Sequence, residues 1–202
     1  PGVVDRAKGL VVSTPNMRLS GFRMAATLQK RLALPVALGN DVNLGTLGEK
    51  WLGAARDADS VVGIFPGTGI GGGIIIGGQL VRGQGGLAGE IGHMVMQVGG
   101  PRCGCGGRGC LEALASRTAI ERDIRAALRA GRKSIVTRLL DRPGDLIRSS
   151  VLRDALAARD KLVTEVMRRA AKVLGAACLS IRHLLDPDAI VLGGGVIEAC
   201  GD

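Results

Sequence analysis

The spacing of hydrophobic residues along the chain predicts a mixed α/β fold. Apolar residues recur at helical spacing in five stretches, and most strongly in the last: about 21–33, 42–56, 110–130, 149–159 and 161–185. Runs rich in β-branched or buried apolar residues predict strands at 3–12, 35–38, 60–65, 74–76 and 189–192. The first of these runs is expected to form two short strands around a turn. Between 60 and 82, strands alternate with glycine turns, an order typical of an antiparallel meander.

The starts of two predicted helices carry further expectations. Ser20 is placed to cap the helix at 21–33. Asp41 follows the predicted strand at 35–38 and precedes the helix at 42–56, so it lies at a strand-to-helix junction. Ligands of α/β proteins bind at the carboxyl ends of strands. Asp41 is therefore either a helix N-cap or a general base within a binding site.

The composition excludes several classes of protein. With 46% hydrophobic and 22% charged residues the chain is typical of a folded globular protein. No apolar run reaches the roughly 20 residues of a membrane helix, and we find no signal peptide, so a cytoplasmic protein without membrane contact is expected. The net charge of +9 comes from basic residues dispersed along helices, and one Trp and two Phe offer little for bases to stack on, which disfavours nucleic-acid binding by this segment.

Glycine is unusually frequent, with 33 of 202 residues, about twice the usual share of roughly 7%. The glycines cluster without a three-residue period, which excludes collagen and indicates tight functional loops. In the segment 67–71, backbone N–H groups can converge on an anion, and the Thr68 hydroxyl adds a hydrogen bond. The same glycines match a dinucleotide fingerprint, but that motif requires a helix where the run 74–76 follows. The segment is either a phosphate-binding hairpin or a purely structural turn.

Four soft or borderline metal ligands lie within 18 residues: His93, Cys103, Cys105 and Cys110. The glycines between them permit the chain to wrap around a small ion, and the set suits tetrahedral Zn²⁺ in a structural site. The alternative is a loop with free thiols, because the spacing is not the common paired C-x-x-C pattern. Cys178 and Cys200 are expected to be small buried hydrophobic residues.

Two carboxylates flank this predicted metal loop. Glu90 precedes His93 by three residues, and Glu112 follows Cys110 by two. A metal site would bring both carboxylates and the imidazole into a small volume. Such a group suits a polyhydroxylated ligand, because each sugar hydroxyl both donates and accepts hydrogen bonds.

Several segments combine into a recognisable set. They are Asn40-Asp41-Val42-Asn43 with Leu47-Gly48-Glu49, Gly67-Thr68-Gly69-Ile70-Gly71, Gly89-Glu90-Ile91-Gly92-His93, and Cys103-Gly104-Cys105-Gly106-Gly107-Arg108-Gly109-Cys110-Leu111-Glu112. This set resembles the ROK family of bacterial sugar kinases and sugar-responsive repressors. The Pro1-Gly2 opening and the segment 187–195 are similar to the same family. The order and spacing of the His and three Cys are the most specific part of the resemblance.

The resemblance implies an α/β actin-like ATPase (ribonuclease H-like) fold in which two domains close on sugar and ATP. Residues 1–39 would be a remnant of the smaller domain and 40–202 most of the larger one, with a zinc-binding loop at about 93–110. The family's N-terminal phosphate loop, an Asp-x-Gly-Gly-Thr-like motif, is not found in these 202 residues. We therefore expect a part of a longer protein, with little kinase activity by itself.

The resemblance also implies roles for individual residues. Asp41 resembles the catalytic base that takes the proton of the sugar's 6-hydroxyl. The residues similar to sugar ligands are Asn40, Glu90, His93 and Glu112, of which His93 would also bind zinc. The residues similar to the second phosphate loop are Gly67, Thr68, Gly69 and Gly71, and those similar to the adenosine loop are Gly193, Gly194 and Gly195. Mg²⁺ would accompany ATP and bridge its phosphates.

These residues are compatible with three functions. The intact Asp41 favours an ATP-dependent kinase acting on a hexose, with glucose the favoured substrate. The alternative is a sugar-sensing transcriptional repressor, in which the same pocket binds an inducer and an N-terminal helix-turn-helix binds DNA. A structural zinc module without ligand chemistry is the third. The resemblance also favours a homodimer or homotetramer.

Overall fold

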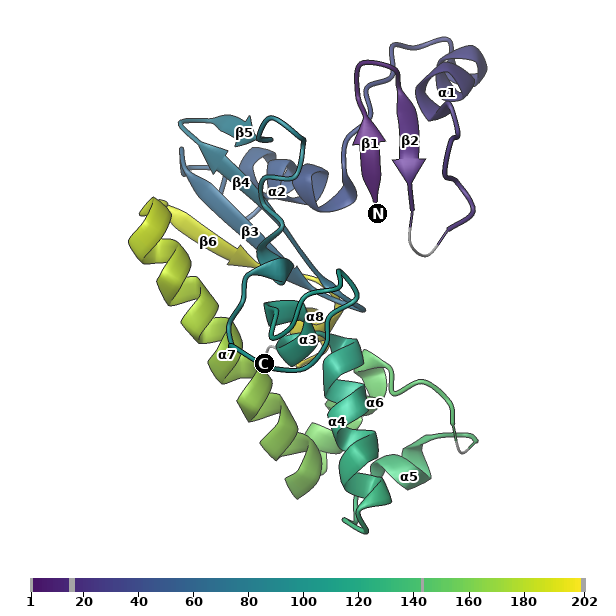
Figure 1. The fold of residues 1–202 in the computed structure, drawn as a ribbon, viewed down its shortest axis with the longest axis vertical. Helices are drawn as coiled ribbons and strands as arrows, with labels where there is room; N and C mark the ends of the chain where they lie inside the picture. The colour runs from purple at the N-terminus through teal and green to yellow at the C-terminus, as the bar shows by residue number, and fades with distance from the viewer. Residues whose placement is uncertain (1, 15–16, 143, 201–202) are drawn as a thin grey trace.

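The computed structural model describes residues 2–14, 17–142 and 144–200 (Figure 1). The strands form two sheets. They are β1 (Val3–Asp5), β2 (Leu10–Ser13), β3 (Val61–Pro66), β4 (Ile70–Ile76), β5 (Gln79–Val81) and β6 (Ala189–Leu192). The helices are α1 (Met24–Leu32), α2 (Asp41–Trp51), the short 3₁₀ helix η1 (Ile91–His93), α3 (Leu111–Ala115), α4 (Arg117–Arg129), α5 (Val136–Leu139), α6 (Ser149–Ala157), α7 (Lys161–Leu185) and α8 (Gly195–Cys200).

The N-terminal elements lie apart from the rest of the molecule (Figure 1). β1 and β2 form an antiparallel pair, and α1 packs beside β2. The Ala25 amide of α1 donates to the Gly9 carbonyl in the turn between the strands, at 3.1 Å. Residues 33–40 then lead to α2 without forming a helix or strand.

The second sheet has the strand order β5-β4-β3-β6. β3, β4 and β5 are antiparallel neighbours, so the predicted meander is confirmed. The predicted strand at 189–192 is also confirmed, and it pairs with β3 in parallel. It follows α7, whose 25 residues span the 161–185 stretch of strongest apolar periodicity. Within the described residues, no helix is both long and apolar enough to span a membrane.

Side chains of β3 are buried on both faces of the sheet. Val62 and Ile64 join the main core, which contains helical residues such as Leu111 and Ile181. Val61 points to the opposite face and packs in a smaller cluster on the side of α2. β3 is therefore a central strand with helices on both sides, which explains its uninterrupted apolar sequence.

The glycines at 71–73 lie inside β4, although the sequence predicts a strand only over 74–76. A Cβ added to Gly73 would lie 2.3 Å from Thr46 Oγ1, and one added to Gly71 would lie 2.5 Å from Val42. Thr46 and Val42 belong to α2, so these glycines allow the helix to pack directly on the strand backbone. The turn itself is short, comprising 67–69.

Two other N-terminal expectations are wrong. Residues 35–38 form no strand; they lie in the connection between the two sheets, where no described strand pairs with them. Ser20 does not cap α1, because the helix begins at Met24. The Ser20 hydroxyl instead accepts a hydrogen bond from the Thr14 amide at 3.1 Å.

The predicted helix at 110–130 is two helices, α3 and α4, which meet at Ser116. Ser116 has an extended backbone, and its hydroxyl accepts a hydrogen bond from the Ala119 amide at 3.2 Å, so it caps α4. Of the two cysteines expected in the core, Cys178 is half-buried against it, and the side chain of Cys200 is outside the described part of the chain. Pro1 also lies outside it.

The buried Asp160 fixes the start of α7. Its Oδ1 accepts from the Val163 amide and its Oδ2 from the Ile135 amide, both at 2.9 Å. Burial alone would raise the pKa of this carboxyl, but hydrogen bonds from Val163 and Ile135 outweigh it, and the pKa lies below its usual value of 3.8. The carboxylate thus joins α7 to the segment before α5.

We predict that Asp160→Ala lowers the free energy of unfolding by about 2 kcal/mol at pH 7, because both amides lose their acceptor. A lowered folded-state pKa stabilises the protein above the unfolded-state pKa, and this contribution is lost as the pH falls through the folded value. The difference between wild type and variant should therefore shrink below about pH 4. Urea denaturation at pH 7 and pH 3 measures it, and an equal difference at both would contradict the prediction. The exposed Asp154, replaced by Ala, is the control.

Candidate functional site

Two glycine turns lie at the same edge of the large sheet. β3 and β6 are parallel, with Ile64 opposite Leu192, so their carboxyl ends coincide. β3 continues into the turn 67–69, and β6 continues into Gly193 to Gly195. The Gly193 amide donates to the Ile64 carbonyl at 3.1 Å. The carboxyl edge of the sheet therefore presents both predicted nucleotide-binding turns together, where α/β sheets commonly bind ligands.

The start of α2 lies near this edge. Val42 packs over Gly71 at the turn end of β4. The helix N-cap is Asn40, whose Oδ1 accepts from the amides of Val42 (3.1 Å) and Asn43 (3.3 Å) and whose Nδ2 donates to the Gly2 carbonyl at 3.2 Å. The N-cap reading of Asp41 is therefore wrong: Asp41 is the first residue of the helix itself and is exposed.

The beginning of β4 is held by two other elements. Glu112 of α3 accepts a hydrogen bond from the Ile70 amide on its Oε2 at 3.0 Å. Gly92 of η1 packs on the Ile70 carbonyl so closely that a Cβ would lie 1.9 Å from that oxygen. These contacts place His93 and Glu112 beside the turn 67–69.

The predicted metal ligands converge. All four ligand atoms of His93, Cys103, Cys105 and Cys110 lie within 4.8 Å of one another. Cys103 Sγ is 3.6 Å from His93 Nδ1, and Cys105 Sγ is 3.8 Å from Cys110 Sγ. A tetrahedral ion with metal–sulfur bonds of about 2.3 Å requires ligand separations of about 3.8 Å. The cluster therefore has the dimensions of a tetrahedral site.

Burial and hydrogen bonding shift the pKa values of the three thiols in this cluster. Burial raises the pKa of the Cys103 thiol to about 12 and also raises the pKa of Cys110. The Gly107 amide lowers the pKa of Cys105 by hydrogen bonding to its sulfur. Metal ions bind cysteine as the thiolate, so a bound metal would have to displace the thiol protons of Cys103 and Cys110.

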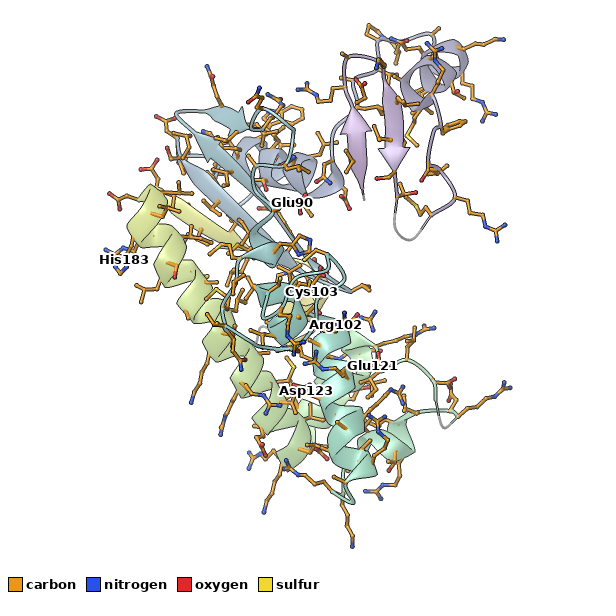
Figure 2. All side chains as sticks on the ribbon, viewed as in Figure 1. Glu90, Arg102, Cys103, Glu121, Asp123 and His183 are labelled. Carbon is orange, nitrogen blue, oxygen red and sulfur yellow. The ribbon has the colours of Figure 1, made fainter. Side chains whose placement is uncertain are left out.

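The second nitrogen of His93 faces a carboxylate. Nδ1 lies next to Cys103, and Nε2 lies 4.0 Å from Glu90 Oε2. Glu90 and Asn40 line a cavity of about 150 Å³ between the N-terminal segment and the large sheet. His93, Glu112 and Thr68 line a separate, open groove of about 680 Å³. Figure 2 shows Glu90 near the meander and Cys103 between the meander and the helices.

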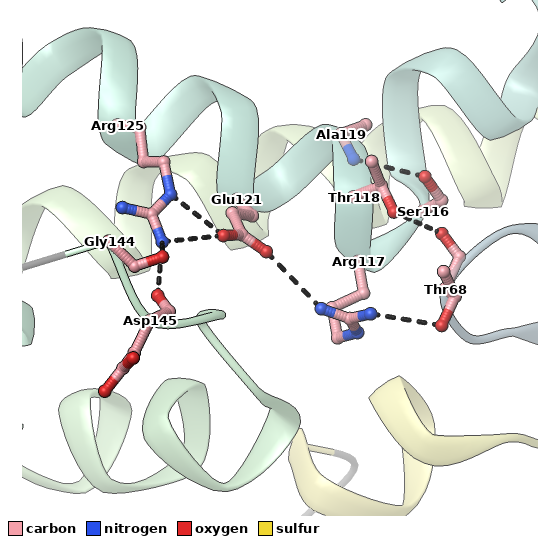
Figure 3. Close-up of polar contacts among 9 residues, drawn as sticks. All are labelled: Thr68, Ser116, Arg117, Thr118, Ala119, Glu121, Arg125, Gly144 and Asp145. Atoms are coloured by element: carbon pink, nitrogen blue, oxygen red, sulfur yellow. Dashed lines mark hydrogen bonds and ion pairs between the residues drawn. The ribbon is translucent and has the colours of Figure 1, made fainter. Parts of the chain in front are cut away.

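The structure therefore gathers most of the predicted site residues into two adjoining hollows. The predicted residues that line neither hollow are Cys110, which is buried, and six residues at or near the carboxyl edge of the sheet: Asp41, Gly67, Gly71, Gly193, Gly194 and Gly195. Arg117 and Thr118, which no sequence motif predicts as site residues, both contact Thr68 (Figure 3). The signal that could have revealed them was Ser116, a helix-capping residue type within an otherwise helical stretch.

Comparison with known proteins establishes the family. The model of the ROK family matches residues 1–201, and the chain belongs to this family. The fold is the actin-like ATPase fold that the resemblance implied, with its mixed sheet between helices.

Individual relatives include both enzymes and regulators. A glucokinase of Thermotoga maritima is 38% identical over 98% of this chain and 63% of its own length. The structure of a ROK family glucokinase from Streptomyces griseus in complex with glucose and AMPPNP has a TM-score of 0.85 and 34% identity, covering 98% of this chain and 64% of that one. A ROK family transcriptional regulator, a homolog of the E. coli MLC protein, has a TM-score of 0.84 and 32% identity, covering 98% and 49%. The chain thus spans less than two thirds of the length of these relatives.

We predict that the purified protein contains one Zn²⁺ per chain and that Cys105→Ser reduces both the bound zinc and the thermal unfolding temperature, because one of four ligands is lost. Zinc affinity should fall as the pH is lowered, since protons compete for the thiolates. Elemental analysis and thermal unfolding measure these effects. Cys178→Ala, outside the cluster, serves as the control and should retain zinc. A well-folded wild-type sample with substoichiometric zinc would contradict the prediction.

Proposed function

We propose that the full-length protein catalyses ATP-dependent phosphorylation of a hexose at its 6-hydroxyl, with glucose the favoured substrate. The observation that carries this proposal is the convergence of three features at one sheet edge: the start of α2 with Asp41, the turn 67–69 and the turn after β6. Relatives described as glucokinases support it, one of them in a complex with glucose and AMPPNP.

In this proposal Asp41 is the general base. Its carboxylate accepts the proton of the 6-hydroxyl as that oxygen attacks the terminal phosphorus of ATP. Asp41 is exposed at the first position of α2, so a ligand bound at this edge can approach it. The Asn40 side chain, through its contacts with Val42 and Gly2, fixes where the helix begins and thereby where this carboxylate lies.

Asn40, Glu90, His93 and Glu112 bind the sugar hydroxyls. Glu90 and Asn40 share one hollow and Glu112 and His93 the other, and the Glu90–His93 approach of 4.0 Å joins the two. Carboxylates accept hydrogen bonds from hydroxyls, and the histidine nitrogen turned away from the cysteines can donate or accept. A polyhydroxylated ring presents the complementary set.

The nucleotide is held by the two glycine turns. Gly67, Thr68, Gly69 and Gly71 contact its phosphates, and Gly193, Gly194 and Gly195 contact its adenosine. Gly194 has φ +86°, a conformation that favours glycine, and this allows the turn after β6 to stay compact beside Pro66. Mg²⁺ bound to ATP supplies positive charge to the transferring phosphoryl group.

The Cys and His cluster would hold a structural Zn²⁺. Its four protein ligands would complete the coordination, and its separations fit a tetrahedron. His93 would be oriented by the metal at Nδ1, so that Nε2 is fixed toward the sugar. We also propose that residues 1–39 are a remnant of the smaller domain and 40–202 most of the larger one. A cytoplasmic location and assembly as a homodimer or homotetramer stay predictions.

We predict that Asp41→Asn in the full-length protein lowers kcat by about 100-fold or more while leaving sugar affinity nearly unchanged, as loss of a general base should. A coupled assay of ADP release measures kcat, and calorimetry measures sugar binding. Asp57→Asn, a change at an exposed position whose side chain pairs only with the neighbouring Arg56 in the described residues, is the matched control. An unchanged kcat in Asp41→Asn would refute the role of Asp41.

A sugar-sensing transcriptional repressor is the second candidate. The regulator homologous to the MLC protein matches this chain with nearly the same TM-score as the glucokinase, 0.84 against 0.85. The fold therefore does not separate the two functions, and the carboxylate at position 41 favours the kinase. Sugar-dependent hydrolysis or transfer from ATP by the full-length protein is expected for a kinase. Sugar binding without ATP turnover, combined with sugar-dependent release of DNA, would favour the repressor.

A further inference from the structure

The start of α4 donates three hydrogen bonds to the turn after β3, two to Thr68 (Figure 3) and one to Gly67. Arg117 Nη2 donates to Thr68 Oγ1 at 3.0 Å. The Thr118 hydroxyl donates to the Thr68 carbonyl at 2.7 Å, and the Arg117 amide donates to the Gly67 carbonyl at 2.9 Å. The first two residues of one helix thus hold both the backbone and the side chain of this turn.

The Arg117 contact determines how the Thr68 hydroxyl can be used. A guanidinium has only donors, so Thr68 Oγ1 must be the acceptor in this hydrogen bond. The hydroxyl hydrogen then points away from Arg117. Thr68 is exposed and lines the groove that also contains His93 and Glu112, so a ligand in this groove can accept that hydrogen. Donation from a charged group also polarises the hydroxyl and strengthens it as a donor.

Arg117 itself is held in a partly buried ion-pair ladder. Its Nη1 lies 3.4 Å from Glu121 Oε2, and the two side chains are only 15% and 12% exposed. Glu121 Oε1 accepts from Arg125 Nε at 2.8 Å, and Arg125 in turn donates to the carbonyl of Asp145 (Figure 3). Two arginines share one carboxylate, so the ladder keeps one unit of positive charge, next to the turn.

We propose that Arg117 is a positioning residue for the phosphates of a nucleotide bound at this turn, and that it acts through Thr68. It occupies a lone pair of the Thr68 hydroxyl, leaves the hydroxyl hydrogen available to a phosphate oxygen and brings positive charge within one hydrogen bond of that oxygen. This inference rests on the proposed kinase function and adds a determinant of nucleotide use that lies outside the two glycine turns. Glu121 and Arg125 restrict the guanidinium to the orientation that reaches Thr68.

The test compares Arg117→Met, Thr68→Val and the double variant of the full-length protein. Methionine keeps much of the unbranched stem and removes the charge and the donors, and valine replaces the hydroxyl by a methyl group of similar size. Each single variant should lower kcat/KM for ATP by about tenfold or more, the effect of losing a charge-assisted hydrogen bond. The KM for the hexose should stay unchanged. The double variant should be no worse than Thr68→Val, because Arg117 acts through that hydroxyl.

Arg132→Met is the matched control, because it removes a guanidinium that pairs with Glu165, away from Thr68 and from the Arg117 ladder. It should leave kcat/KM for ATP within about twofold of wild type, even if the thermal unfolding temperature falls. Equal losses in Arg132→Met and Arg117→Met, additive losses in the double variant, or a raised KM for the hexose would overturn the inference. A wild type that phosphorylates no hexose would overturn the proposed function along with it, whereas an active wild type with an unaffected Arg117→Met would overturn this inference alone.

Discussion

The hydrogen bond from the Ile70 amide to Glu112 connects the parts of the site that the sequence separates. Glu112 Oε2 accepts this bond at 3.0 Å, and Glu112 Oε1 lies 3.6 Å from Cys103 Sγ. One carboxylate therefore touches both the first residue of β4 and a member of the Cys and His cluster. The turn before β4 and the cluster are fixed relative to each other, so any ligand that spans them meets a preformed arrangement. Such preformed polar groups orient a ligand with little loss of conformational freedom on binding.

The central strand β3 carries this arrangement through backbone contacts. Its parallel partner β6 brings the second glycine turn to the same edge, and its antiparallel partner β4 begins at the residue that Glu112 holds. α2 packs on the glycine backbone of β4 with almost no side-chain layer between them. The position of Asp41 is consequently tied to the backbone of the sheet, without a flexible loop of its own.

The sequence predicted what depends on local periodicity and spacing. α7, β6 and the meander follow from the apolar pattern, and the four metal-type ligands follow from their spacing in a glycine-rich loop. Features that depend on tertiary partners were not predictable. Ser20 pairs with the Thr14 amide because the chain folds back there, and residues 35–38 have no strand beside them. The break between α3 and α4 at Ser116 could not be predicted, because apolar residues keep their helical spacing across it. The contacts of Arg117 depend on this break, so they could not be predicted either.

The segment that connects the two sheets affects the size of the smaller hollow, the 150 Å³ cavity. Asn40 Nδ2 donates to the Gly2 carbonyl, and Arg6 Nε donates to the Leu38 carbonyl at 3.1 Å. The residues on either side of β1 are therefore hydrogen-bonded to the end of the segment that connects the two sheets. The walls of the 150 Å³ cavity come from both sides of this joint, with Val4 on one and Glu90 on the other. Its width is therefore set by the angle between the two sheets. A small ligand that fits only one angle binds with an apparent affinity proportional to the fraction of molecules already at that angle. Its binding then increases that fraction.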